Sequence, residues 1–426
     1  MRLTGEPQEG GARSFLVLVH PYPPTPSSGA HRWGGIVKYL RRAGHDVRVV
    51  TSGAFGPLAD PDEERGVIRT LDLMASARLR RLAGLQPLAR PGSGGGGGAE
   101  LPGVLTKFVV PDAFLLSWAP MGLRAAWSSL RQRPADCVIT SSPNESTHLV
   151  GMALKRRFGH AWIADLRDGW TFERFLPDFP TAAQRSLNAS LERRALIRAD
   201  AVTAATRPIA DDLRARHAIP VEHVPNAWDP DLEPAGAPAE PARNGHIRLV
   251  HTGMLSGGWG RDPDALFTGL RRLLDERPEL QERLRFVVAG ELSETDTRLI
   301  ARERLDGVVS SVGYVPRADA LRLQREADVL VLVTSRHAGE ATGKVFEYLA
   351  AGRPIVALAA ANEAARIVEE TGTGVAVDPA DPEAVLDALR AAVSGDLRYE
   401  PRGLEGYVQP APAQRIAEVA ERALRG

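Results

Sequence analysis

Short runs of apolar residues recur along the chain, each followed by a longer stretch with helical spacing. Five lie in the first half, at residues 15–19, 46–51, 137–140, 162–166 and 201–205, and six in the second half, at residues 247–253, 285–290, 308–313, 329–334, 355–359 and 374–378. Runs that are apolar throughout are typical of parallel strands covered by helices on both faces. Two such series predict an α/β chain of two doubly wound, Rossmann-like domains that face each other across a cleft, with ligands beyond the carboxyl ends of the strands.

The division into domains follows from length and composition. A chain of 426 residues suits two domains of ordinary size. Residues 234–245 are rich in Pro, Ala and Gly and form the expected linker. We therefore predict an N-terminal domain over residues 1–233, a C-terminal domain over 246–403, and a C-terminal helix within 404–426 that returns to the first domain. Five consecutive glycines within residues 90–100 predict a disordered surface loop.

Composition excludes several classes of protein. Charged residues make up 25% of the chain and hydrophobic residues 43%, as in soluble globular proteins, and the net charge of zero gives no reason to expect a nucleic-acid partner. The single cysteine, Cys137, excludes an internal disulfide and a cysteine-rich metal site, and we expect it to be a buried, inert thiol. No apolar run reaches the ~18 residues that span a bilayer, and the polar N-terminus lacks a signal-peptide core, so a cytoplasmic location is expected.

Lys344 is one of only four lysines in the chain and lies beside Gly343 at the start of a predicted helix. The helix is expected to begin near Thr342, and Gly352 is placed to end it. A helix N-terminus presents free N–H groups and partial positive charge, Gly343 lets an anion approach the backbone, and Lys344 adds a point charge. The pattern indicates a diphosphate site.

Glu347 follows Lys344 one helical turn later. Its carboxylate could accept two hydrogen bonds from a ribose diol, as acidic residues do in dinucleotide sites. The alternative interpretation is a solvated i,i+3 ion pair between the two side chains on an exposed helix.

The segment TGKVFEYLAAGRPIVALAA resembles the signature helix of the retaining nucleotide-sugar glycosyltransferases of family 4, in the branch with a K-x-x-E-Y motif. Other segments follow in the order of that family: VHPYPPTPSSGAHRWGGIVKYLRRAGHDVRVVTS, a D-x-R-D-x-W stretch in IADLRDGWTF, VEHVPNAWDP, LVHTGMLSGGWGRDPDALFTGLRRL and GTGVAVDPADPEAVLDAL. The resemblance covers almost the whole chain apart from the glycine tract. It implies the GT-B fold, with the sugar nucleotide held by the C-terminal domain and most of the acceptor by the N-terminal domain.

The resemblance also implies the roles of individual donor-site residues. Glu347 matches the second glutamate of the family's E-x7-E motif, which binds the ribose, and the backbone near Tyr314 and Val315 matches the segment that meets the base. Arg261 lies near a basic residue that contacts the diphosphate. Together with the helix start, the expected donor-binding residues are Arg261, Tyr314, Val315, Thr342, Gly343, Lys344 and Glu347.

Two departures from the family pattern concern the reacting centre. The first glutamate of E-x7-E falls at Gly339, and we expect Glu340, one residue later, to contact the transferred sugar instead. Many members have His-Asp where this chain has Arg167 and Asp168. An arginine cannot act as a base, but it can stabilise developing phosphate charge, so both residues are candidate catalytic groups. The alternative is that they form a structural ion cluster with Asp165.

Acceptor-binding residues are expected in two segments of the first half. In GAHRWGG, Gly29 would let a phosphate or sugar approach, and His31, Arg32 and Trp33 would line the site. The alternative there is a loop with a packed tryptophan. In SSPNES, Asn144 offers an amide to a sugar or polyol, and the alternative is a simple helix cap.

These features together predict a retaining glycosyltransferase that moves a sugar from a nucleoside diphosphate donor to an acceptor hydroxyl. The acceptor would be a sugar, a cell-surface glycan, a lipid-linked intermediate or another small molecule. No cofactor and no metal are expected besides the donor co-substrate, because Asp-Pro-Asp at Asp262 has the pattern of a helix start rather than a metal site.

Three further interpretations remain open at this point. A basic, apolar stretch at residues 77–90 would suit peripheral contact with the inner face of the membrane, and a solvated helix is its alternative. A sugar-nucleotide epimerase of the same architecture would act on the donor alone. A non-catalytic scaffold on a GT-B fold would account for the missing first glutamate and for Arg167.

Overall fold

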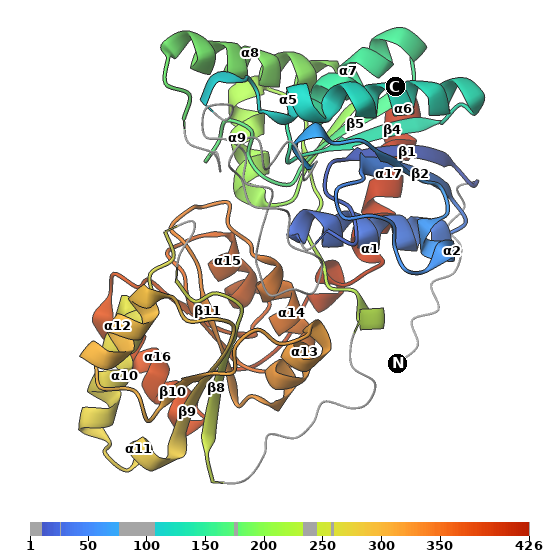
Figure 1. The fold of residues 1–426 in the computed structure, drawn as a ribbon. Coiled ribbons are helices and arrows are strands. Elements are labelled where there is room, and N and C mark those ends of the chain that lie inside the picture. The colour runs from blue at the N-terminus through green and yellow to red at the C-terminus, as the bar shows by residue number, and fades with distance from the viewer. Residues whose placement is uncertain are drawn as a thin grey trace. The chain divides into compact units, whose positions relative to one another are not determined.

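The computed structural model describes residues 11–25, 27–75, 107–173, 178–232, 245–256 and 260–425. Its contacts divide the chain into two units, the first made of Met1–Pro225 with Gln409–Gly426 and the second of Asn226–Val408 (Figure 1). The glycine tract, the basic stretch at 77–90 and most of the predicted linker lie outside the described residues.

The first unit is built on a parallel sheet of seven strands in the order β3-β2-β1-β4-β5-β6-β7. Its strands are β1 (Ser14–Val19), β2 (Asp46–Ser52), β3 (Val67–Thr70), β4 (Cys137–Ser141), β5 (Ala161–Leu166), β6 (Ala201–Ala204) and β7 (Glu222–His223). The strand order reverses between β1 and β4, so the loops after these two strands diverge to opposite faces. In sheets of this kind the crevice at such a point is where ligands bind.

Helices cover both faces of this sheet. They are α1 (Ser28–Arg42), α2 (Pro61–Glu64), α5 (Phe114–Ser117), α6 (Ala119–Gln132), α7 (Ser146–Phe158), α8 (Ala182–Arg198), α9 (Arg207–His217) and α17 (Ala411–Arg425), with a 3-10 turn η1 at Leu73–Ala75. Leu16 and Leu18 of β1 belong to one buried cluster, whereas Phe15 and Val17 belong to the other. Because successive side chains of a strand point to opposite faces, burial on both faces explains why β1 is apolar throughout.

The second unit repeats this plan with six parallel strands in the order β10-β9-β8-β11-β12-β13. The strands are β8 (Ile247–Thr252), β9 (Leu284–Ala289), β10 (Val309–Ser311), β11 (Val329–Val333), β12 (Ile355–Leu358) and β13 (Gly374–Val377). The helices are α10 (Asp264–Glu276), α11 (Leu280–Arg283), α12 (Glu294–Arg302), α13 (Arg317–Glu326), α14 (Gly343–Ala351), α15 (Glu363–Glu370) and α16 (Pro382–Ser394), with 3-10 turns η2 (Pro230–Leu232) and η3 (Leu404–Tyr407). The order reverses between β8 and β11, so the loops after these strands frame the expected ligand crevice.

The unit boundaries differ from the predicted domain boundaries. Residues 226–232, which the sequence analysis assigns to the first domain, belong to the second unit, which also extends to Val408. The reason is local pairing: the Trp228 N–H donates to the Tyr407 carbonyl oxygen at 3.0 Å, and Trp228 forms a parallel bridge with Val408. The segment from Gln409 onward belongs to the first unit, where α17 packs on α1.

Two other features bear on the expectations from sequence. The predicted buried thiol is confirmed: Cys137 is fully buried in β4, and burial raises its pKa. In the described parts of the chain, every helix is too short or too polar to cross a membrane.

Candidate functional site

The second unit carries the candidate donor site at the N-terminus of α14. Thr342 is the N-cap residue, the helix begins at Gly343, and Gly352 ends it in the left-handed conformation with φ 68°. The Thr342 hydroxyl is buried and has no hydrogen-bond partner, so it does not cap the helix. A buried hydroxyl without a partner is costly, and a bound polar ligand would supply one.

Lys344 reaches from α14 to the loop after β8. Its Nζ donates to the Met254 carbonyl oxygen at 3.2 Å and lies 3.5 Å from Nε2 of His251. Gly253 lies beneath it with φ 87°, and a Cβ atom there would be 2.8 Å from the Lys344 Cε atom. This close approach and the left-handed backbone both require a glycine.

Desolvation, and to a smaller extent the charge of Arg261, together lower the pKa of Lys344 to about 7 against the opposing effects of Glu340 and Glu347. Burial, together with the Lys344 charge, lowers the pKa of His251 to about 3, so this imidazole is neutral. An ammonium short of countercharge is stabilised by a bound anion, since an opposite charge nearby favours the charged form.

Arg261 and Glu340 form an ion pair in the same region. Their side chains are 2.9 Å apart and largely buried, with 14% and 9% exposure. Glu340 also accepts a hydrogen bond from the Ser335 backbone N–H at 2.6 Å. The structure thus joins the two residues that the sequence analysis assigns to the diphosphate and to the sugar, with Glu340 neutralising Arg261.

Glu347 pairs with Arg317 of α13 at 2.8 Å, and Gln324 Nε2 donates to it at 3.4 Å. Glu347 and Lys344 therefore have separate partners, and the interpretation as an i,i+3 ion pair between them is wrong. Tyr314 and Val315 lie just before α13 in the loop after β10, where Tyr314 is 56% exposed and Val315 is half-buried. An exposed aromatic ring at that position is open to stacking with a planar base.

Three residues of this region were not predicted from the sequence. They are His251, Arg317 and Gln324, and each holds a predicted residue in place. Gln324 Nε2 also donates to Thr252 Oγ1 at 3.0 Å, which ties α13 to the end of β8. A signal existed only for His251, which is a polar side chain within an otherwise apolar strand run.

In the first unit, Arg32 forms a buried ion pair with Asp165 at 2.8 Å, with side chains 1% and 0% exposed. Asp165 also accepts hydrogen bonds from Ser141 Oγ and Thr203 Oγ1, both at 2.7 Å. Burial alone would raise the pKa of Asp165, but Arg32 and these hydroxyls lower it overall. The expectation that Arg32 and Trp33 line an acceptor site is therefore wrong in this state, because Arg32 is 5% and Trp33 is 2% exposed. Trp33 is packed, as the alternative interpretation expects, but it lies within α1 and not in a loop.

Arg167 and Asp168 follow β5 and form a separate ion pair at 2.5 Å, each side chain being 16% exposed. They do not form one cluster with Asp165, which pairs with Arg32. A Cβ atom on Gly29 would lie 3.2 Å from a guanidinium nitrogen of Arg167, so the glycine lets Arg167 pack against the first turn of α1. The structure brings Gly29, Arg167 and Asp168 together at the carboxyl edge of the sheet.

Two other predicted acceptor residues lie on the same edge. His31 is exposed on α1, and Asn144 is half-buried before α7. The Asn144 carbonyl oxygen accepts a hydrogen bond from Thr147 Oγ1 at 2.7 Å, so its backbone supports the start of α7. Ser142 Oγ donates to the Asp168 carbonyl oxygen at 3.4 Å and joins the loops after β4 and β5.

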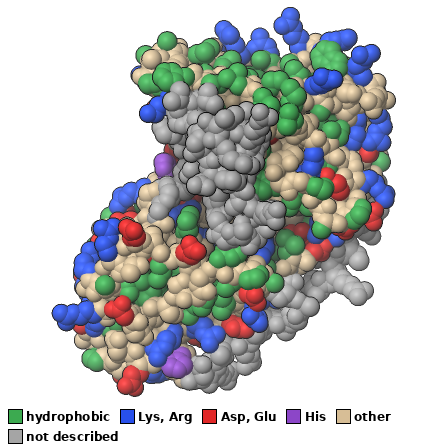
Figure 2. Space-filling model, in the orientation of Figure 1, with side chains coloured by type: hydrophobic (Ala, Val, Ile, Leu, Met, Phe, Trp, Pro, Cys, Tyr) green, Lys and Arg blue, Asp and Glu red, His purple; other side chains and the backbone are tan. Residues whose placement is uncertain are grey.

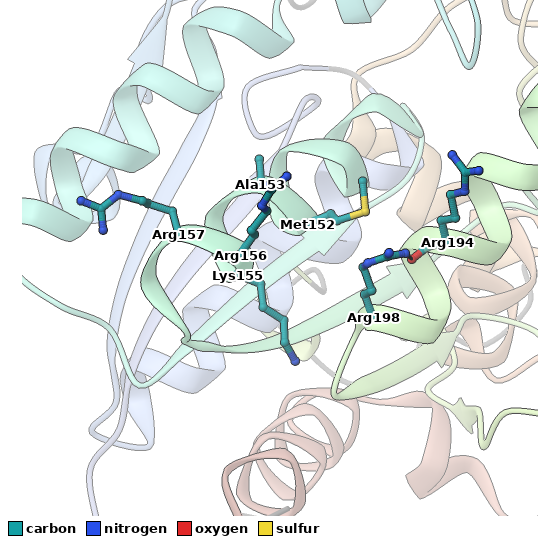
Figure 3. Close-up of a pocket in the computed structure, with 7 residues that line it drawn as sticks. All are labelled: Met152, Ala153, Lys155, Arg156, Arg157, Arg194 and Arg198. Atoms are coloured by element: carbon teal, nitrogen blue, oxygen red, sulfur yellow. Dashed lines mark hydrogen bonds between the residues drawn. The ribbon is translucent and has the colours of Figure 1, made fainter.

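A groove of about 1040 Å³ lies between α7 and α8, and none of the predicted site residues lines it (Figure 3). It is lined by Met152, Ala153, Lys155, Arg156, Arg157, Arg194 and Arg198. Lys155 forms an ion pair with Asp200. Among the residues that the structure describes, the four arginines have no carboxylate partner within ion-pair distance. Figure 2 shows Lys and Arg side chains along the edge of the first unit beside hydrophobic ones. We call the groove lined by these seven residues, Met152 to Arg198, the basic groove.

Within the described part of the chain, no group of three or more His, Cys, Asp or Glu side chains could hold a metal ion.

Two family models match the chain in its two halves. The model described as glycosyl transferase 4-like domain matches residues 29–227, and the model described as glycosyl transferases group 1 matches residues 260–394. These ranges contain the predicted acceptor-side residues and the predicted donor-side residues, respectively.

Individual relatives are more distant. A D-inositol 3-phosphate glycosyltransferase from Nocardioides sp. is 32% identical over 145 residues, which is 32% of this chain and only 31% of that protein's length. The structure of the lipopolysaccharide outer core galactosyltransferase WaaB in its apo form is similar over 96% of this chain and 99% of its own, with a TM-score of 0.60 and 12% identity. A trehalose-6-phosphate protein from E. coli bound with UDP-2-fluoro glucose is similar over 97% and 95% of the two chains, with a TM-score of 0.55 and 14% identity.

At this identity the solved structures establish the fold, and the family models agree with it unit by unit. The chain therefore has the GT-B fold of glycosyltransferases, and its first half matches the glycosyl transferase 4-like domain while its second half matches the glycosyl transferases group 1 model.

Proposed function

We propose that this protein is a retaining glycosyltransferase that transfers a sugar from a nucleoside diphosphate donor to an acceptor hydroxyl without a metal ion. The observation that carries the proposal is Lys344, a half-buried ammonium at the N-terminus of α14 with no carboxylate partner among the described residues. Lys344, the helix N–H groups and the unsatisfied Thr342 hydroxyl together suit a diphosphate.

The remaining donor contacts follow from the partners of each side chain. Arg261, held beside the site by Glu340, supplies a second cation for the diphosphate as negative charge develops on the leaving group. Glu347, oriented by Arg317, accepts the ribose hydroxyls, and Tyr314 and Val315 meet the base. When Arg261 turns from Glu340 to the diphosphate, the Glu340 carboxylate oxygen that it leaves contacts the transferred sugar.

On the acceptor side, the proposal places the reacting hydroxyl near Gly29, Arg167 and Asp168. His31 and Asn144 contribute from the neighbouring loops. The acceptor is a sugar, a cell-surface glycan, a lipid-linked intermediate or a small polyol. Because one relative bears the name D-inositol 3-phosphate glycosyltransferase, a phosphorylated cyclic polyol belongs in any screen of acceptors.

We further propose a cytoplasmic protein that contacts the inner face of the membrane peripherally. The support is the basic groove, whose four arginines have no carboxylate partner among the described residues and would attract anionic lipid head groups. Leu187 and Ile197 of α8 are exposed by 48% and 49%, and they could enter the interfacial layer of the bilayer beside these cations.

A thermal-shift experiment tests the donor site directly. UDP, GDP, dTDP and ADP are each added to wild type, to a Lys344→Ala, Glu347→Ala double variant, and to the matched surface variant Arg322→Ala. A ligand that binds only the folded protein stabilises it by about 2.7 kcal/mol at one hundred times its Kd. One nucleotide should raise the midpoint of wild type and Arg322→Ala but not that of the double variant.

Three outcomes decide between the interpretations. No shift in wild type at millimolar nucleotide contradicts the transferase proposal and favours a scaffold. Interconversion of the bound sugar nucleotide without any acceptor favours an epimerase. Binding followed by transfer to an added acceptor supports the proposal.

A further inference from the structure

Gln324 of α13 is a fully buried polar side chain to which the proposed transfer gives no role. Its Nε2 atom donates to Thr252 Oγ1 at 3.0 Å and to Glu347 Oε2 at 3.4 Å. Its Oε1 atom is buried and has no hydrogen-bond partner among the described residues. A buried amide with one end unpaired is less favourable than an apolar side chain of the same size. The contacts of Nε2 therefore need a reason other than packing.

The partners of Gln324 determine which end of its amide faces Glu347. Glu347 is a carboxylate in an ion pair with Arg317, and an ionised carboxylate only accepts hydrogen bonds. The amide nitrogen must therefore face Glu347, because the amide oxygen would repel it. Thr252, the last residue of β8, accepts from the same nitrogen. The amide is thus fixed between the end of a strand and a side chain of α14.

Two residues of α13 hold the two oxygens of Glu347 separately. Arg317 Nη2 lies 2.8 Å from Oε1, and Gln324 Nε2 donates to Oε2. Arg317 and Gln324 lie two helical turns apart on one face of α13, and this helix packs on α14 (Figure 1). The carboxylate of Glu347 is therefore restrained in position and in rotation about its last bond.

The restrained carboxylate still has acceptor sites for a ligand. A carboxylate offers about two such sites on each oxygen, and Arg317 and Gln324 each use one. The side chain of Glu347 is 25% exposed, so a ligand can reach it. Two hydroxyl groups on neighbouring carbons can then donate one hydrogen bond to each oxygen. A carboxylate free to rotate would lose this matched geometry.

The two contacts to Glu347 differ in their exposure to solvent. The Arg317 side chain is 38% exposed, and ion pairs of this kind are weak and screened by salt. Gln324 is fully buried, so water does not compete for its amide. Its hydrogen bond to Glu347 is long, and hydrogen bonds in unliganded sites often shorten only when the ligand is bound. Gln324 is therefore the contact on which a fixed carboxylate depends.

We propose that Gln324 is a positioning residue that holds Glu347 for a diol, so that the donor site selects ribonucleoside diphosphates over 2′-deoxyribonucleoside diphosphates. This inference rests on the proposed function, in which Glu347 accepts the ribose hydroxyls. A ribose offers one hydroxyl at C2′ and one at C3′, which is one for each oxygen of Glu347. A 2′-deoxyribose leaves one of these oxygens desolvated without a donor, which is unfavourable. The donor therefore carries UDP, GDP or ADP rather than dTDP.

Binding measurements with and without the 2′-hydroxyl test this inference. UDP, GDP and ADP, each with its 2′-deoxy form, and inorganic pyrophosphate are titrated into wild type and Gln324→Met. At least one ribonucleotide should bind wild type at least ~ten-fold more tightly than its 2′-deoxy form, the usual effect of losing a hydrogen bond to a charged group. Methionine fills a similar volume but cannot donate. Gln324→Met should therefore bring this ratio close to one and leave pyrophosphate affinity unchanged.

Two further variants separate positioning from a structural role. Arg322→Ala, at an exposed position of the same helix, should keep the wild-type ratio. Because Gln324 acts through Glu347, Gln324→Met should weaken ribonucleotide binding in wild type but add no further loss in a Glu347→Ala background. An equal loss in both backgrounds, or equal weakening of ribonucleotide, 2′-deoxy form and pyrophosphate, would show that Gln324 is only structural and would overturn the inference.

The failure of this inference is distinct from failure of the proposed function. If wild type binds the 2′-deoxy forms or dTDP as tightly as the ribonucleotides, the inference is wrong while the proposed function stands. If wild type binds no nucleotide of either kind, the proposed function fails and the inference fails with it.

A second measurement needs no variant. In wild-type protein with 15N-labelled glutamine, the side-chain N–H signals of Gln324 should shift when the ribonucleotide is added and stay in place with pyrophosphate. Signals that do not respond to the ribonucleotide, or that move as far with pyrophosphate, would overturn the proposal even if Gln324→Met failed to fold.

Discussion

Lys344 Nζ donates to the Met254 carbonyl oxygen at 3.2 Å, a neutral partner that leaves the ammonium charge uncompensated. This contact spans 90 residues of sequence and joins the start of α14 to the loop after β8. It explains why Lys344 is poised for an anion: geometry holds the side chain in place, and burial lowers its pKa to about 7.

Nucleotide affinity should depend on pH through Lys344. The diphosphate favours charged Lys344, whose pKa is about 7 without ligand, so binding requires proton uptake above pH 7. Affinity should therefore fall as pH rises from 7 to 9, and calorimetry in two buffers of different ionisation enthalpy should detect the proton uptake. Lys344→Arg is the control, since arginine stays charged and removes this dependence. An equal slope in wild type and Lys344→Arg would show that Lys344 does not titrate on binding.

The same lowered pKa affects stability without ligand. Between the folded pKa of about 7 and the unfolded value near 10.4, the unfolded chain binds more protons at Lys344, so stability from this group rises with pH across that window. The thermal midpoint of wild type should therefore rise relative to that of Lys344→Met between pH 7 and pH 9. A constant difference between the two midpoints would contradict the lowered pKa.

Ligands with and without a ribose should distinguish the role of Glu347 from that of Lys344. Inorganic pyrophosphate carries the diphosphate charge but no ribose, so Glu347→Ala should keep pyrophosphate binding and lose about ten-fold or more in affinity for the complete nucleoside diphosphate. Lys344→Ala should weaken both ligands. Arg317→Ala serves as a control for loss of the ion partner of Glu347. Equal weakening of both ligands by Glu347→Ala would place Glu347 at the phosphate rather than at the ribose.

Sequence patterns were sufficient for the elements that carry the site but not for the partners of its side chains. Strand runs such as residues 329–334 are continuous and apolar, and their burial on both faces is a local signal. The missed strands β3 and β7 give little such signal: Val67–Thr70 is half-buried, and Glu222–His223 has only two residues. Family resemblance placed Glu347, but nothing in the sequence indicated its pairing with Arg317.

Arg32 shows most clearly what a local sequence pattern cannot predict. Its place beside a glycine-rich helix start suggested contact with a ligand, whereas in the structure it pairs with Asp165, 133 residues away in the sequence. A local pattern reports that a charge is present but not whether a distant carboxylate will bury it. Asp165 of β5 is what makes Arg32 a structural residue.

Removing one partner of this buried pair should be strongly destabilising. Arg32→Ala leaves Asp165 as an uncompensated buried carboxylate, which costs about 3–5 kcal/mol. The urea midpoint followed by tryptophan fluorescence should fall well below that of Arg322→Ala, a substitution at an exposed position of α13 that should change stability by less than ~0.5 kcal/mol. An unchanged midpoint with lost activity would instead return Arg32 to the acceptor site.

The basic groove should make membrane binding depend on lipid charge. Arg194→Glu with Arg198→Glu reverses two of its charges, and each cation near an anionic surface contributes about 1 kcal/mol. Wild type should co-sediment with vesicles of phosphatidylglycerol and phosphatidylcholine but not with phosphatidylcholine alone, and the double variant should bind the anionic vesicles at least ten-fold more weakly. Arg322→Glu on α13 of the second unit is the matched control.

Salt should weaken the wild-type interaction, because exposed charges are screened beyond about 8 Å at physiological ionic strength. Binding that survives both the charge reversal and high salt would place the membrane contact elsewhere on the protein, and absence of binding to any vesicle would contradict the peripheral location.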